Sequence, residues 1–322
     1  MRVAPTLAFL LALGCSLDSE ALGTGGPNLG DGTSSTGGLV SSSGPPATGT
    51  TGDASTGEPA STSSTSTGDA SSSSGGESDG TTGDPGMDAS LLARWWVNEA
   101  ASGQTPILLA DDASDPLDLP IAYVGAMPVF TTVDGNRGLS WDAAELDGRP
   151  LIPIIGSKIE TELGGRTHAT VELVITPVAF SGSTSRFLHI GTGSGDDLAI
   201  GAPAFDSLQV RWRGAPTMHF DAKLDTTRQV IHVVVDTTQP MVTDRVLVYV
   251  NGVPLPHANA EGPDRDAGLP LQASSALTLG NRSDGQRSFQ GSLQYAAIYL
   301  EPFKPSRVGL AVAALKSSDD GP

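Results

Sequence analysis

The stretch Leu208-Gln209-Val210-Arg211-Trp212-Arg213 alternates apolar and polar side chains without interruption. Successive side chains of an extended strand point to opposite faces, so Leu208, Val210 and Trp212 share one face and the polar residues share the other. The pattern therefore predicts a strand with one buried face and one polar face.

Other stretches extend this β pattern. Residues 245–250 are apolar on both faces, which predicts a strand covered on each side. Asn251-Gly252 follows as a two-residue type I′ hairpin turn. Val171, Leu173 and Ile175 share one face of a further predicted strand. Only residues 306–316, which are short and rich in Ala and Leu, predict a helix.

Short apolar runs separated by Gly, Pro, Asn and Asp clusters continue from residue 90 onward. Such spacing is typical of a sandwich or barrel. We therefore expect residues 88–322 to form one all-β domain, a two-sheet antiparallel jelly-roll sandwich.

Residues 16–87 have a different composition. They contain no Lys, Arg or aromatic residue and are dominated by Ser, Thr, Gly, Ala and Pro. A segment with so few apolar side chains cannot offset the entropy of ordering its backbone, so a disordered, acidic, low-complexity linker is predicted. Its Ser and Thr content leaves two interpretations open, a plain spacer or a glycosylated stalk.

The first fifteen residues have the outline of a signal peptide, with Arg2, an apolar run over 7–13, and Gly14 before Cys15. Residues 11–15 resemble a bacterial lipobox, although Ala12 stands where Leu is usual and Leu13 where a small residue is usual. The resemblance implies diacylation of Cys15 and export as an outer-membrane or cell-surface lipoprotein. The alternatives are an incidental cysteine in an ordinary signal, with a periplasmic or secreted product.

The charge of the chain restricts its partners. The formal net charge is −18, and residues 88–322 carry 17 Lys and Arg against 27 Asp and Glu. Their longest basic cluster is Arg211-Trp212-Arg213. Nucleic acid and anionic membrane surfaces need a basic face, so neither is an expected partner, and membrane contact is expected through the lipid anchor alone.

Several segments resemble, in order, the laminin G-like, concanavalin A-like lectin-glucanase superfamily, as it occurs on bacterial lipoproteins. They are Leu91–Trp96, 138–142, 170–175, 232–236, 248–252, 277–281, 289–291 and 298–299. The resemblance implies a jelly roll that binds an extracellular carbohydrate or protein ligand in adhesion or recognition. Which residues bind the ligand, and the oligomeric state, stay open.

The glucanases of this superfamily carry a Glu-x-Asp-x-x-Glu strand, because a retaining mechanism needs two carboxyl groups about 5 Å apart. No such run occurs in this sequence. We therefore predict a non-catalytic protein. A divergent glycoside hydrolase or lyase is the alternative, and a purely structural envelope protein is a third possibility.

One metal site is suggested by resemblance. Animal laminin G domains bind calcium through an Asp in a loop, and Asp196 and Asp197 occupy a matching loop. Calcium prefers six to eight oxygen ligands, so Asn281 or Asp284 would complete the site. The alternative is a solvated acidic turn. No other cofactor is expected.

His232 lies in an apolar stretch and is predicted to be a hydrogen-bonded core residue. The tryptophans are predicted to belong to the core, the alternative being a cofactor site built on them. They are Trp95, Trp96, Trp141 and Trp212.

Overall fold

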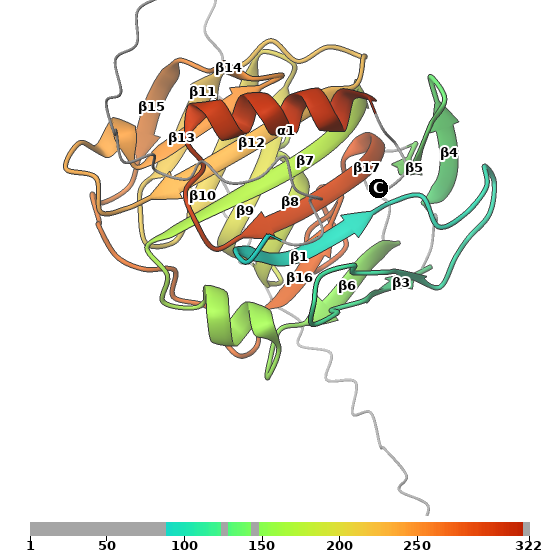
Figure 1. Cartoon of the computed structure of the whole chain (residues 1–322), viewed down its shortest axis with the longest axis horizontal. Helices are drawn as coiled ribbons and strands as arrows, with labels where there is room; N and C mark the ends of the chain where they lie inside the picture. Colours follow the sequence, from blue (N-terminus) through green and yellow to red (C-terminus); the bar gives the residue numbers. More distant parts are fainter. Residues whose placement is uncertain (1–87, 124–127, 143–147, 318–322) are drawn as a thin grey trace, which may run out of the picture. The chain divides into compact units, whose positions relative to one another are not determined.

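The computed structural model describes residues 88–123, 128–142 and 148–317. Two antiparallel sheets pack against each other in this part of the chain, which confirms the predicted all-β sandwich (Figure 1). The predictions for residues 1–15 and 16–87, including lipidation of Cys15, lie outside the described residues.

The first sheet is formed by eight strands. Its order is β14 (Val253–Pro254), β13 (Val246–Val250), β12 (Gln229–Asp236), β7 (His168–Ala179), β17 (Gln290–Tyr299), β5 (Asn136–Trp141) and β4 (Val129–Val133), and β1 (Leu91–Trp96) also pairs with β17. Leu91 lies opposite Tyr299, so the first strand of the domain pairs with its last.

The second sheet is formed by nine strands. Its order is β15 (His257–Glu261), β11 (Thr217–Asp221), β10 (Ser207–Trp212), β9 (Gly195–Ala204), β8 (Ser185–Thr192), β16 (Ala276–Leu279), β6 (Arg149–Pro153), β3 (Leu119–Ala122) and β2 (Leu108–Leu109). This order brings β8, β9 and β10 together at the middle of the sheet.

The core lies between the two sheets and follows the alternation read from the sequence. Leu208, Val210 and Trp212 of β10 are buried in it, as predicted. Trp95 and Trp141 are also buried, which confirms the core assignment for three of the four tryptophans. Trp96 differs, because it packs on Tyr295 outside this core, with ring centroids 4.6 Å apart.

The predicted hairpin turn is confirmed by the backbone. Asn251 has φ 53° and Gly252 has φ 82°, and a type I′ turn needs positive φ at both positions. The prediction that residues 245–250 are covered on both faces is wrong for Leu247, which is 39% exposed. Its strand lies next to the two-residue edge strand β14, so its outer face is only partly covered.

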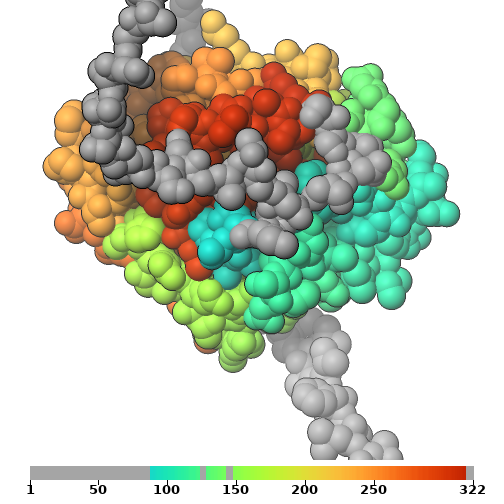
Figure 2. Space-filling model, viewed as in Figure 1, coloured from blue at the N-terminus to red at the C-terminus, as the bar shows by residue number. Residues whose placement is uncertain are grey.

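The predicted helix is α1 (Pro305–Ser317), and it lies on the outer face of the eight-stranded sheet. Val308, Val312 and Leu315 of α1 join a second apolar cluster with Val174 and Val230 of the strands below. Figure 2 shows α1 at the molecular surface on this side.

Two further helical segments, Ile159–Leu163 and Val242–Asp244, were not expected, because each is too short to show a period. Within the described ranges no helix is both long and apolar enough to cross a bilayer.

Candidate ligand-binding site

The outer face of the nine-stranded sheet carries polar side chains because the inner face takes the apolar ones. In β10 the inward residues leave Gln209 and Arg211 pointing outward. Gln209 lies opposite His219 of β11, with their side-chain nitrogens 3.4 Å apart. Register thus places polar groups from neighbouring strands side by side on this face.

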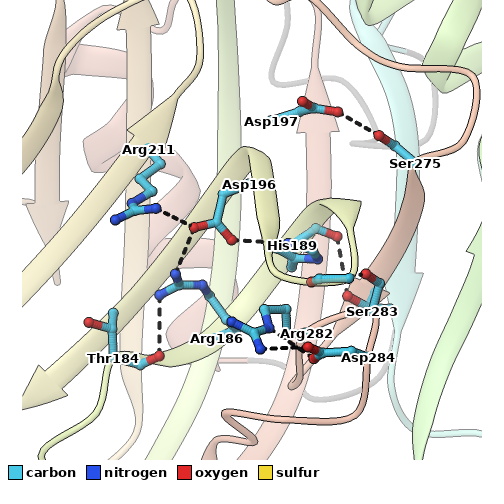
Figure 3. A network of polar contacts seen from close by, with 12 residues as sticks. Thr184, Arg186, His189, Asp196, Asp197, Arg211, Ser275, Arg282, Ser283 and Asp284 are labelled. Atoms are coloured by element: carbon cyan, nitrogen blue, oxygen red, sulfur yellow. Dashed lines mark hydrogen bonds and ion pairs between the residues drawn. The ribbon is translucent and has the colours of Figure 1, made fainter. Parts of the chain in front are cut away.

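Four of these residues form a compact charged group, which we call the outer-face cluster: Arg186, His189, Asp196 and Arg211 (Figure 3). Asp196 Oδ2 accepts hydrogen bonds from Arg186 Nη2 at 2.9 Å and from Arg211 Nη1 at 2.7 Å. His189 Nε2 lies 3.1 Å from Asp196 Oδ1. One carboxylate therefore contacts cationic or potentially cationic side chains from β8 and β10.

The cluster is mostly closed to solvent. The side chains of Arg186 and Asp196 are each 2% exposed, whereas that of Arg211 is 42% exposed. Burial raises the pKa of Asp196, but the neighbouring histidine and the two arginines outweigh burial and hold this pKa well below its ordinary value. Asp196 is therefore ionised at neutral pH, and Arg211 links the buried cluster to the surface.

A pocket of about 220 Å³ opens where β9, β10, β11 and β15 end. Its charged walls are Asp196, Arg211, Arg213, Glu261 and Arg265, and Trp212, Ala215, Pro216, Thr217, Gly262 and Pro263 complete it. Thr217 and Glu261 are cross-strand partners, so register places both on the same wall. The pocket thus combines hydrogen-bond donors, acceptors and some apolar surface.

The four residues considered for calcium do not converge on one point. Asp196 and Asp197 are neighbours on a strand, and their carboxylates contact separate partners (Figure 3). Asp197 accepts from Arg213 Nη1 at 2.7 Å and from Ser275 Oγ at 2.5 Å.

The other two positions are engaged as well. Asn281 Oδ1 accepts the backbone N–H of Arg282 at 2.7 Å, and Asp284 forms a bidentate pair with the Arg282 guanidinium. Among the described residues no group of three or more His, Cys, Asp or Glu side chains is arranged to hold a metal ion. The geometry shows arginine-paired carboxylates at the place where calcium was expected.

A second buried polar group lies on the eight-stranded sheet. Glu172 Oε1 is 3.0 Å from His232 Nε2, and Glu172 Oε2 accepts from the Tyr295 hydroxyl at 3.1 Å. Burial and the negative charge of Glu172 raise the pKa of Tyr295 well above its ordinary value. These contacts confirm His232 as a hydrogen-bonded core residue, and the group joins β7, β12 and β17.

Sequence reasoning missed the outer-face cluster and the pocket. The available signal was Arg211-Trp212-Arg213, the longest basic cluster of residues 88–322, which served only to exclude polyanion binding. In the structure it supplies three residues of the pocket. Arg186 and His189 gave no signal, because their relation to Asp196 depends on how β8 and β9 pair.

No family model and no curated protein matches the sequence. Solved structures similar in fold include a Trypanosoma rangeli sialidase in complex with 2,3-difluorosialic acid, with 16% identity, TM-score 0.47, 71% of this chain covered and 33% of the sialidase. The chain thus spans about a third of the sialidase's length.

Two isolated domains are also similar in fold. One is domain 4 of the GH43 extracellular arabinanase of Geobacillus stearothermophilus, in complex with arabinotriose, with 15% identity, TM-score 0.44, and 69% of this chain and 98% of that domain covered. The other is the CBM40 of the Ruminococcus gnavus IT-sialidase, bound to α2,3-sialyllactose, with 10% identity, TM-score 0.40, and 57% and 96% covered. At such identities the likeness concerns the β-sandwich fold alone.

Proposed function

We propose that this protein is a non-catalytic, surface-displayed lipoprotein whose β-sandwich binds a carbohydrate through the pocket of the nine-stranded sheet. The observation that carries the proposal is the composition of the pocket walls. Sugars offer hydroxyl groups that both donate and accept hydrogen bonds, together with apolar C–H surface, and a site for them needs all three kinds of partner.

The walls supply these partners. Arg211 and Arg213 are each about two-fifths exposed on their side chains and present guanidinium donors. Glu261 presents a carboxylate acceptor with 64% of its side chain exposed. Pro216 and Ala215 add apolar surface beside them.

Binding without catalysis is supported by the state of Asp196. Glycoside hydrolysis needs a carboxyl group that holds a proton for the leaving oxygen, so its pKa must be raised. The pKa of Asp196 is instead held well below its ordinary value by its neighbours. Arg186 and Arg211 also occupy Oδ2 of this carboxylate. The carboxylate of Asp196 therefore holds these two arginine side chains in place.

Display at the surface rests on the N-terminal sequence. Diacylation of Cys15 would attach the chain to the outer membrane, and residues 16–87 would hold the sandwich away from it. Labelled palmitate should be incorporated by the wild type and not by Cys15→Ala. Equal labelling of both would remove the anchor from the proposal and leave the binding site intact.

The binding proposal is tested with the chain from Ser16 onward on a glycan array, followed by titration of each hit. Thr217 is a partly exposed pocket residue, so Thr217→Tyr would fill the pocket and should weaken binding at least about tenfold. Thr243→Tyr is the matched control, because Thr243 is exposed and lies outside the pocket.

Each result of this experiment has a defined reading. No binding to any glycan, or equal binding by Thr217→Tyr and the wild type, would refute the pocket as a carbohydrate site. Release of reducing ends or unsaturated sugars from a bound polysaccharide would instead show an enzyme.

A further inference from the structure

The pocket has a local charge opposite to that of the domain around it. Residues 88–322 carry 17 basic and 27 acidic residues, yet the pocket walls hold three arginines and two carboxylates. In an acidic domain, arginines gathered at one pocket form a local site that attracts negative charge.

The pocket carboxylates do not neutralise these arginines. Asp196 is shared between Arg211 and Arg186, and Arg186 lies outside the pocket walls. Burial lowers the pKa of Arg186, and the positive charges of Arg287 and Arg211 lower it further against the pull of Asp196. Two arginines therefore share the single carboxylate of Asp196.

The other arginines of the pocket are also accessible to a ligand. Arg213 pairs with Asp197, which is buried behind the wall, and keeps 43% of its side chain exposed. Arg265 is exposed, and its guanidinium has no ion-pair partner in the part of the chain that the structure describes. Glu261 lies 3.5 Å from His219. A ligand in the pocket thus meets at least two half-exposed or exposed guanidinium groups.

Accessible hydrogen-bond donors line the pocket. The side chains of Arg211 and Arg213 are 42% and 43% exposed and carry guanidinium groups. A ligand that supplies acceptor oxygens would match these groups, and a carboxylate is the acceptor that a guanidinium binds most strongly.

Size and overall charge limit the ligand further. The volume of about 220 Å³ is below the roughly 300 to 1,000 Å³ of drug-sized sites, so the pocket suits one sugar ring. A densely charged polymer would be repelled by the excess of acidic residues elsewhere in the domain. The ligand should therefore carry its charge on an isolated or terminal unit.

We propose that the pocket recognises a single carboxylated sugar, at the end of or sparsely placed along an otherwise neutral glycan, through Arg211, Arg213 and Arg265. This inference rests on the proposed function, since it names the class of carbohydrate bound there. The guanidinium groups would bind the carboxylate of the sugar, and the remaining walls of the pocket would contact its ring.

The test is calorimetric titration of the chain from Ser16 with methyl glycosides of glucuronic, galacturonic and N-acetylneuraminic acid, each beside its carboxyl-reduced counterpart. At least one acidic glycoside should bind, and its reduced counterpart should bind at least about tenfold more weakly. Raising the salt concentration should weaken binding of the acidic form only.

Two single-residue variants test whether an arginine of the pocket binds the carboxylate of the sugar. Arg265→Gln should weaken binding of the acid severalfold and leave the melting temperature unchanged, because the side chain of Arg265 is exposed and forms no ion pair with any of the residues that the structure describes. Lys304→Gln removes the same charge from an exposed residue just before α1 and should have no effect.

The outcomes separate this inference from the proposed function. If neutral and acidic glycosides bind equally and Thr217→Tyr abolishes the binding of both, the pocket is a carbohydrate site and the carboxylate inference is overturned. If sulfated sugars bind as well as carboxylated ones, the specificity for carboxylate is overturned. If no glycan of any kind binds, both proposals fall.

Discussion

Replacing Asp196 by alanine should destabilise the domain strongly. Arg186 is 2% exposed, and Asp196 is the one carboxylate with which it pairs among the described residues. The substitution leaves a buried guanidinium whose remaining hydrogen-bond acceptor among the described residues is the backbone oxygen of Thr184. Removing one member of a buried ion pair costs about 3 to 5 kcal/mol, which lowers the melting temperature of a domain this size by about 6 to 20 °C.

The assay is thermal unfolding of the chain from Ser16 at neutral pH, followed by circular dichroism. Glu261→Ala is the control, because the 64%-exposed side chain of Glu261 should matter by less than about 0.5 kcal/mol. The double variant Arg186→Met, Asp196→Ala should regain at least about half of the loss, since it no longer buries an unpaired charge at position 186.

The effect also has a defined pH dependence. The pKa of Asp196 is lower in the folded state than the ordinary value of 3.8, so its stabilisation is complete above that value. It disappears as the pH falls through the folded-state pKa. The gap between wild type and variant should therefore shrink in acid. If Asp196→Ala lowers the free energy of unfolding by less than about 1 kcal/mol at neutral pH, or if the difference from the wild type widens in acid, the reasoning is refuted.

Three further predictions follow from other contacts. Millimolar calcium or a chelator should leave the melting temperature of the wild type and of Asp197→Ala unchanged, because arginine and serine already occupy the carboxylate of Asp197; a rise with calcium would restore the calcium site. Gly252→Ala should cost about 1 to 2 kcal/mol in urea unfolding, since φ is 82° there, and an unchanged midpoint would contradict this. Glu172→Ala should lower the free energy of unfolding by about 1 to 3 kcal/mol for each buried partner left unpaired, and Glu172→Gln should lower it by less. Equal losses for both variants would argue against the hydrogen bonds to His232 and Tyr295.

The sandwich could be predicted because its signals are local. Alternation in β10 and positive-φ residues at Asn251 and Gly252 are read within a few positions of the chain. Leu247 was misjudged because the position of a strand within a sheet is not a local property. An apolar residue next to a sheet edge looks the same in sequence as one at the centre.

The site could not be predicted for a related reason. The acidic pair Asp196-Asp197 has the sequence of a metal loop, and only the pairing of β8, β9 and β10 shows that arginines face both carboxylates. Arg186 and Asp196 are ten positions apart, and a shift of one residue in the hairpin would turn one of them to the other face. The register of β8, β9 and β10 thus determines whether Asp196 and Asp197 pair with arginines or face solvent.

The pairing of β1 with β17 sets the order in which the domain is completed. Leu91 to Trp96 must wait for Tyr295 to Tyr299, almost the last residues of the sandwich, before they find their partners. Contacts so distant along the chain form late and slowly. The eight-stranded sheet is therefore incomplete until β17 is present, whereas every strand of the nine-stranded sheet precedes β17 in the chain.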